Sequence, residues 1–168
     1  MWCRYVTFAI AVNVGLVSVG WAQGLEQQLV IVVNKANPVE NLPLADLRKI
    51  FLGEQRHWEN GEKITVVMRN PGQSERIAML QHVYKMSETD FARYFLKATF
   101  TGMVSSAPKV FATPVGVRKF VRTLPGAIGY LRASELDQSV KPVRVDGHLP
   151  GEAGYPLPLL STSGANEF

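Results

Sequence analysis

One stretch of the sequence, from Ile64 to Tyr84, restricts the fold more than any other. It opens with the short β-branched run ITVVM, continues with the polar turn RNPGQS, and ends with apolar residues at helical spacing. A β-branched run bounded by turn residues predicts a buried strand, and the later spacing predicts an amphipathic helix. We therefore expect a strand–turn–helix unit whose turn lies over the carboxyl end of the strand.

The turn of this unit has the chemistry of an anion site. The first amide N–H groups of a helix lack intrahelical partners, and the helix dipole adds partial positive charge there. Arginines flank the turn on both sides, and such a place binds anions readily. The predicted ligand-binding residues here are Arg69, Asn70, Gly72, Gln73, Ser74 and Arg76. Two alternatives use the same groups without a ligand: a solvated Arg69 at a strand end, and helix capping by Ser74.

The rest of the chain alternates strands with helices. Leu29–Val33 is a near-continuous apolar run, which is typical of a strand buried on both faces, as in parallel sheets. Helices are predicted over 44–52, 88–99 and 113–124, and further strands over 127–131 and 143–145. This alternation predicts an α/β domain with a mostly parallel sheet flanked by helices.

A second turn follows the Leu29–Val33 strand. In parallel α/β sheets, ligands lie beyond the carboxyl ends of the strands. The turn from Asn34 to Asn37 would then lie at the same edge as Arg69–Ser74, which makes Asn34 a further candidate for ligand binding. The alternative is ordinary turn chemistry, because asparagine before proline is common in turns.

The two ends of the chain differ from its middle. Residues 1–22 combine Arg4, an apolar run and small residues before Ala22, which predicts a cleaved signal peptide. An uncleaved membrane anchor is the alternative, because the run is nearly long enough to span a bilayer. Cleavage would leave an α/β domain over 23–146. From Gly147 onward the sequence is rich in Gly, Pro and Ser, which predicts a flexible C-terminal tail over 147–168.

The composition narrows the function. The only cysteine, Cys3, lies in the predicted leader, so the mature chain would hold no disulfide and no thiolate site. The net charge of +4, or +3 without Arg4, is too small for a nucleic-acid binder. His57, His82 and His148 lack the spacing of metal ligands, so no metal and no cofactor are predicted.

One motif is similar to that of a class of enzymes. Gly72–Arg76, GQSER, partly resembles a nucleophile elbow and has the required strand–turn–helix context. Arg76 stands where that motif has its final glycine, and His148 lies in the predicted tail, where no acid–His–Ser geometry is assured. The sequence therefore favours a binding protein over a hydrolase.

The order of the motifs resembles a known family. VVNKANPV, LPLADLRKIFLG, a tryptophan, ITVVMRNPGQSE, FTG and LPGAIGYL follow one another through the predicted domain. This order resembles the phosphate-binding periplasmic proteins of ABC importers, which have the type II periplasmic binding-protein fold. The resemblance implies phosphate or a related oxyanion as ligand, a periplasmic location and an ABC permease as partner.

Two departures limit what the resemblance implies. A full member has two lobes, whereas this chain resembles one of them, and a homodimer would supply a second wall. The family's ligand turn reads Arg, any residue, Asp, Gly, Ser, Gly, Thr; Arg69 and Gly72 match it, but Pro71 and Glu75 replace its Asp and Thr. The alternative function is therefore a single-lobe periplasmic interaction or sensory domain that has lost tight phosphate binding.

Overall fold

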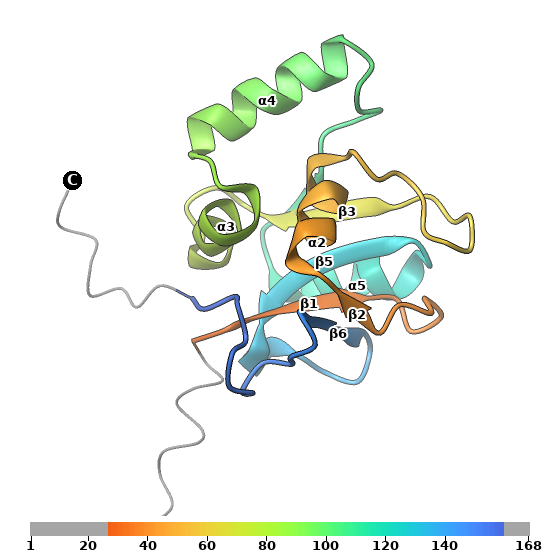
Figure 1. Ribbon diagram of the computed structural model, residues 1–168, viewed down its shortest axis with the longest axis vertical. Helices are drawn as coiled ribbons and strands as arrows, with labels where there is room; N and C mark the ends of the chain where they lie inside the picture. Colours follow the sequence, from red (N-terminus) through yellow and green to blue (C-terminus); the bar gives the residue numbers. More distant parts are fainter. Residues whose placement is uncertain (1–26, 160–168) are drawn as a thin grey trace, which may run out of the picture.

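The computed structural model describes residues 27–159, so the predicted signal peptide and residues 160–168 lie outside the described part of the chain. A six-stranded sheet in the order β2-β6-β1-β5-β3-β4 carries helices on both faces (Figure 1). The strands are β1 (Leu29–Val33), β2 (Asn41–Leu42), β3 (Thr65–Arg69), β4 (Lys109–Phe111), β5 (Ala127–Arg132) and β6 (Lys141–Val145). The helices are α2 (Leu44–Leu52), α3 (Ser74–Met79), α4 (Glu88–Phe100) and α5 (Pro114–Thr123), with a π-helical turn η1 (Leu80–Tyr84) and a 3₁₀ turn η2 (Ala133–Glu135).

The sheet is mostly parallel, as the alternation predicts, but β1 is the exception. β3 pairs in parallel with β4 and β5, and β2 pairs in parallel with β6. β1 pairs antiparallel with both β5 and β6, so it alone runs against the other five strands. The expectation that β1 is parallel is therefore wrong. An apolar run reports burial on both faces and carries no information about strand direction.

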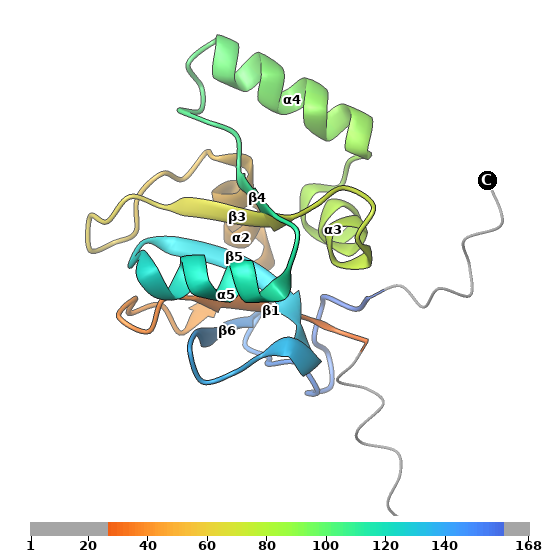
Figure 2. The same ribbon diagram turned by 180° about the vertical axis from the view of Figure 1, so that it is seen from behind.

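The core lies on both faces of the sheet. On β1, Leu29, Ile31 and Val33 face one hydrophobic cluster, whereas Val30 and Val32 face another. The first cluster is covered by α2, α3, η1 and α4, and the second by α5, and these helices lie on opposite sides of the sheet in Figures 1 and 2. This two-sided burial explains the continuous apolar sequence of β1.

The helix α4 lies beyond the β3–β4 edge of the sheet (Figures 1 and 2). Its first turn is capped by Ser87, whose hydroxyl accepts a hydrogen bond from the Asp90 amide at 3.1 Å. Phe91 and Phe95 on its inner face meet the buried ring of Tyr84 at centroid distances of 5.0 and 6.4 Å. These aromatic contacts hold α4 against η1.

The segment 147–159 belongs to the domain, so the predicted tail does not begin at Gly147. The Leu29 amide donates to the carbonyl of Leu157 at 2.9 Å, and Leu157 is completely buried. Just before this segment, a carboxylate oxygen of Asp146 accepts from the Leu44 amide at 2.9 Å and caps the first turn of α2. The Gly, Pro and Ser residues here form turns between packed residues. Composition alone does not distinguish such turns from a flexible tail, because the difference lies in the tertiary contacts.

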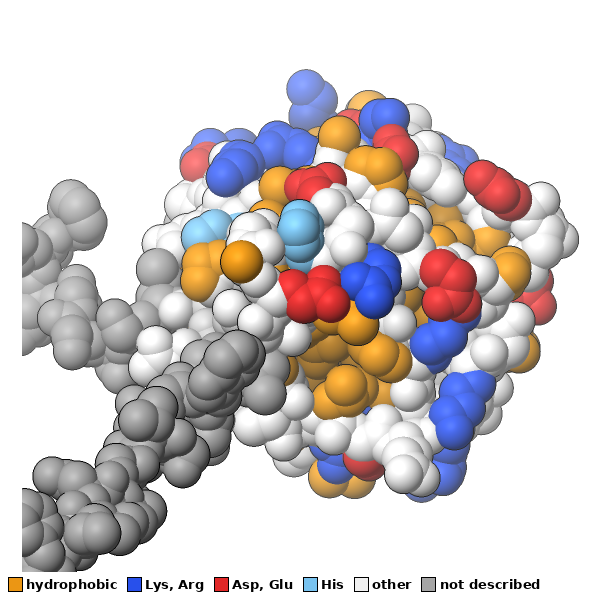
Figure 3. Space-filling view, turned by 60° about the horizontal axis from the view of Figure 1, so that its bottom comes forward, with side chains coloured by type: hydrophobic (Ala, Val, Ile, Leu, Met, Phe, Trp, Pro, Cys, Tyr) orange, Lys and Arg blue, Asp and Glu red, His pale blue; other side chains and the backbone are white. Residues whose placement is uncertain are grey.

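Two further properties of residues 27–159 concern helix length and surface charge. None of the helices there is long and apolar enough to cross a membrane. The face drawn in Figure 3 intersperses Lys and Arg with Asp and Glu side chains around a hydrophobic area. That face therefore shows no broad surface of one charge sign.

Candidate functional site

Hydrogen bonds to a backbone carbonyl and to a tyrosine hydroxyl fix the start of the turn between β3 and α3. The Arg69 amide donates to the hydroxyl of Tyr130 at 3.0 Å, and the Asn70 amide donates to the carbonyl of Phe111 at 3.2 Å. Burial raises the pKa of Tyr130, so its hydroxyl stays neutral. Gly72 has φ +81° and open space where a side chain would stand, so the turn needs glycine for its backbone conformation.

The guanidinium of Arg69 is buried and incompletely paired. Arg69 is only 4% exposed. Its Nη2 contacts Oε1 of Gln73 at 3.4 Å, while Nε and Nη1 have no hydrogen-bond partner among residues 27–159. A buried cation with unsatisfied donors is costly, because it has lost water without gaining an acceptor. This side chain therefore has hydrogen-bonding capacity that the described part of the protein does not fill.

The guanidinium of Arg76 is also buried, but its donors are occupied. Its Nε and Nη2 donate to the two carboxylate oxygens of Glu88 at 2.8 and 2.5 Å, and its Nη1 donates to the carbonyl of Arg69 at 3.0 Å. Its Cζ also lies 4.7 Å from the centre of the Phe91 ring. These contacts connect the end of β3 to α3 and α4. We therefore assign Arg76 a structural role, and we do not propose that it contacts a ligand.

An ion pair that sequence reasoning missed lies beside the turn. Nε of Arg132 donates to Oε1 of the buried Glu75 at 2.6 Å, and Nη2 of Arg132 donates to Oγ of Ser74 at 2.5 Å. Burial by itself raises the pKa of Glu75, but the hydrogen bonds from Arg132 and from its own amide, with the charges of Arg132 and Arg69, outweigh burial and lower it. Glu75 is thus held as a carboxylate.

Nothing in the local sequence points to Arg132. It is the last residue of β5, and it reaches the turn only because β5 pairs with β3. The signal that identifies it is the strand order of the folded sheet.

The structure does not bring Asn34 to this site. Because β1 runs against β3, Asn34 lies at the opposite end of the sheet from Arg69. Its Nδ2 donates to the carbonyls of Val121 and Arg122 at 2.9 and 2.7 Å, which satisfies the C-terminal end of α5. The residues that do come together are Arg69, Asn70, Gly72, Gln73 and Ser74.

The chemistry of the assembled turn is that of charge recognition. Two arginines, Arg69 and Arg132, face one carboxylate, Glu75, while Arg76 is balanced by Glu88. The Ser74 hydroxyl contacts Arg132 and Glu75, and no histidine is among its partners. Within residues 27–159 there is also no group of three metal-ligating side chains. The arrangement can hold an anion.

Comparison with known proteins shows the family and the fold of this chain. Residues 27–156 match the sequence model of the family described as "PBP superfamily domain". The fold is similar to the crystal structure of an ABC-type phosphate transport receptor from Vibrio cholerae, with 23% identity and a TM-score of 0.60, over 74% of this chain and 48% of that one.

Two further solved structures have a similar fold. A putative phosphate ABC transporter substrate-binding protein with bound phosphate from Clostridium perfringens is 23% identical, with a TM-score of 0.61, over 74% of this chain and 47% of its own. PstS from Borrelia burgdorferi is 13% identical, with a TM-score of 0.61, over 79% of this chain and 55% of its own. The chain thus spans about half the length of these proteins. The resemblance indicated by the motifs and the α/β fold class are both confirmed.

Proposed function

This chain belongs to the family described as the PBP superfamily domain, and on that basis we propose that it is a solute-binding protein that takes phosphate or a related oxyanion at the turn from Arg69 to Ser74. It would act by binding and delivery, without catalysis. The periplasm is the proposed location, and an ABC permease in the inner membrane is the proposed partner.

The observation that carries this proposal is the state of the Arg69 guanidinium. It is 4% exposed, and two of its three nitrogens have no acceptor among residues 27–159. A tetrahedral oxyanion presents several acceptor oxygens and a full negative charge, which suit the planar fork of an arginine. Bound there, the anion would supply the acceptors that the described residues do not.

The backbone around Arg69 favours the same ligand. The first-turn amides of α3, at Ser74, Glu75 and Arg76, have no carbonyl to bond within the helix. Gln73, which contacts Arg69 at 3.4 Å, is an exposed side chain. Displacing so long a contact costs little, so an oxyanion would replace the Gln73 amide in front of Arg69.

Isothermal titration calorimetry with phosphate, sulfate and arsenate at low ionic strength tests the proposal. We expect saturable phosphate binding by the wild type and at least about tenfold weaker binding by Arg69→Met. Arg93→Met is the matched control, because Arg93 is an exposed arginine on α4 that pairs with Asp90 on the same helix. Equal phosphate affinity in the wild type and in Arg69→Met would contradict the proposal.

One observation favours a second function, a periplasmic interaction or sensory domain without tight phosphate binding. Glu75 already places a carboxylate inside the turn, where it engages Arg132 at 2.6 Å. An internal anion weakens the attraction for an external one. No heat with any of the three oxyanions, from a protein that unfolds cooperatively, would favour this second function.

A homodimer, which would supply a second wall to the site, remains a prediction from the sequence. Sedimentation velocity with and without phosphate would test it.

A further inference from the structure

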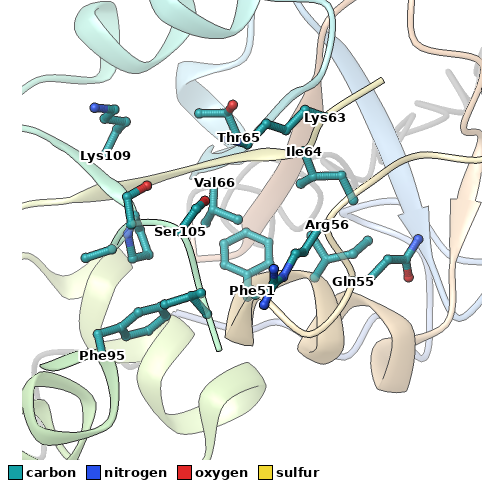
Figure 4. Close-up of a pocket in the computed structure, with 16 residues that line it drawn as sticks. Phe51, Gln55, Arg56, Lys63, Ile64, Thr65, Val66, Phe95, Ser105 and Lys109 are labelled. Atoms are coloured by element: carbon teal, nitrogen blue, oxygen red, sulfur yellow. The ribbon is translucent and has the colours of Figure 1, made fainter. Parts of the chain in front are cut away.

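A separate cavity lies at the other end of β3. It has a volume of about 290 Å³ and is bounded by α2, α4, the start of β3 and the loop 101–109 (Figure 4). Thr65, the first residue of β3, lines it, whereas Arg69, the last residue of β3, begins the oxyanion turn. The cavity is therefore distinct from the proposed phosphate site.

The floor of this cavity is apolar and fixed. Phe51 from α2 and Phe95 from α4 line one side, and Val66 from β3 lines another (Figure 4). Phe51 is completely buried, and Phe95 is 5% exposed. The loop above packs closely on the end of α2, because a Cβ added at Gly53 would come within 2.6 Å of the Val104 side chain. Such a floor suits an apolar ligand group and offers an inorganic anion nothing to bond.

The rim of the cavity is cationic, and two of its cations, Lys63 and Lys109, lie on the other side of β3 from Phe51 and Phe95 (Figure 4). Arg56, Lys63 and Lys109 line it, all three are exposed, and no carboxylate side chain is among the lining residues. The Arg56 guanidinium donates to the carbonyls of Gly102 and Met103, which ties its loop to the loop 101–109. In contrast, neither lysine forms an ion pair with any of residues 27–159. Their positive charges are not neutralised locally.

Hydroxyl groups complete the rim. Ser105 and Ser106 from the loop and Thr65 from β3 add hydroxyl donors to the lining. Ligand sites in proteins commonly combine an apolar interior with a few polar groups that fix orientation, and their volumes begin at about 300 Å³. At about 290 Å³ this cavity has the size of the smallest such sites.

We propose that this cavity binds a small organic carboxylate with an aromatic or short aliphatic body. The body would lie against Phe51 and Phe95, and the carboxylate would extend past the start of β3, where β4 does not pair with it, toward Lys63 and Lys109, with the serine hydroxyls as additional donors. This ligand class follows from the pairing of an apolar floor with a cationic rim that lacks acids.

The test uses benzoate and hexanoate as probes, with benzamide as the uncharged counterpart of benzoate. Binding is followed by two-dimensional NMR of the folded protein, in which shifts of the amides of Thr65 and Ser105 report the site. We expect saturable shifts with at least one carboxylate below about 10 mM, and at least about tenfold weaker binding of benzamide. Shifts that do not saturate with either carboxylate would overturn the proposal.

Two variants localise the binding. Lys63→Glu reverses one rim charge and should weaken carboxylate binding at least about tenfold. Lys119→Glu, an exposed lysine on α5 outside the cavity, is the matched control and should leave it unchanged. Ser105→Phe places a ring at an exposed loop position and should block the cavity in a protein that still folds. Carboxylate binding that survives Lys63→Glu and Ser105→Phe would overturn the proposal.

The Arg69→Met variant separates this inference from the proposed function. It should lose phosphate binding and keep carboxylate binding, because the two sites lie at opposite ends of β3. Loss of both in a folded protein would show that the carboxylate enters the oxyanion turn and would overturn the separate site.

Discussion

The end of β3 and the start of α3 each bury an arginine, and the two regions treat the charge differently. Arg69 is 4% exposed and Arg76 is 3% exposed. At Arg76 every guanidinium nitrogen donates, to Glu88 or to the carbonyl of Arg69. At Arg69 two nitrogens have no acceptor among residues 27–159, and the third has only a 3.4 Å contact with Gln73.

This difference shows that pairing, more than burial, separates a structural arginine from a candidate ligand-binding one. Removal of a buried arginine that pairs with a bidentate carboxylate lowers stability, because its hydrogen-bond partners are left unpaired. A buried arginine with unfilled donors lowers stability until an anion fills them. The two regions should therefore respond in opposite ways when each arginine is replaced by methionine, which keeps much of the apolar volume.

The largest effect is expected at Arg76. Arg76→Met removes the hydrogen bond to Arg69, the contact with Phe91 and the pair with Glu88, so the free energy of unfolding should fall by about 2–4 kcal/mol. We place the loss below the upper range for buried pairs because the side chain of Glu88 is 44% exposed and can return to water. Urea denaturation measures it, with Arg93→Met expected within about 0.5 kcal/mol of the wild type. A loss below about 1 kcal/mol would show that pairing does not distinguish the two arginines.

The next effect is expected at Glu75. Glu75→Gln keeps the shape of the side chain but removes the charge that faces Arg132. The free energy of unfolding should fall by about 1–2 kcal/mol near pH 7. The loss is limited because the side chain of Arg132 is 40% exposed and can return to water. The folded-state pKa of Glu75 lies below its ordinary value of 4.5. Its stabilisation is therefore fully present above the unfolded pKa and is lost as pH falls through the folded pKa.

Urea titrations of the wild type and of Glu75→Gln at about pH 7 and about pH 3 measure this dependence. The difference between the two proteins should shrink at the lower pH, because below the ordinary pKa of 4.5 the carboxyl group of the unfolded wild type takes up a proton more readily than that of the folded protein. A difference that stays constant would mean that Glu75 is not the charged partner of Arg132.

Much of the architecture could be predicted from the sequence, because it rests on local patterns. The helix over 44–52 and the strand–turn–helix around Arg69 follow from apolar spacing and turn chemistry within a few neighbouring residues. The direction of β1 could not be predicted in this way, because it depends on which strand β1 meets. The placement of Asn34 failed for the same reason.

The position of the site could be predicted from the sequence, but the pairing of its charged side chains could not. Local chemistry identifies Arg69, Gly72 and the turn. It cannot show that Arg76 pairs with Glu88, twelve residues later, or that Arg132 reaches the turn across the sheet, since both depend on packing between elements. Pairing is what assigns different roles to Arg69 and Arg76, and pairing is a property of the tertiary structure.

Phosphate should stabilise the wild type through Arg69. At a free phosphate concentration ten times its dissociation constant, linkage predicts an increase of about 1.4 kcal/mol in the free energy of unfolding. The increase should fall to about 0.4 kcal/mol or less in Arg69→Met, as tenfold weaker binding requires, and Arg93→Met should retain it. Thermal unfolding with and without phosphate measures it, at constant ionic strength set with chloride. An equal increase in the wild type and in Arg69→Met would place the anion elsewhere.

The smallest effect is expected at Arg69 itself, in the absence of any oxyanion. Arg69→Met should leave the free energy of unfolding unchanged or raise it by up to about 1 kcal/mol, because it removes two buried donors that have no acceptor among the described residues. The Coulomb attraction between Arg69 and Glu75 opposes this gain and keeps it small. Urea denaturation in phosphate-free buffer measures the change. A loss above about 2 kcal/mol would mean that Arg69, like Arg76, is paired within the folded protein, and the contrast between the two regions would disappear.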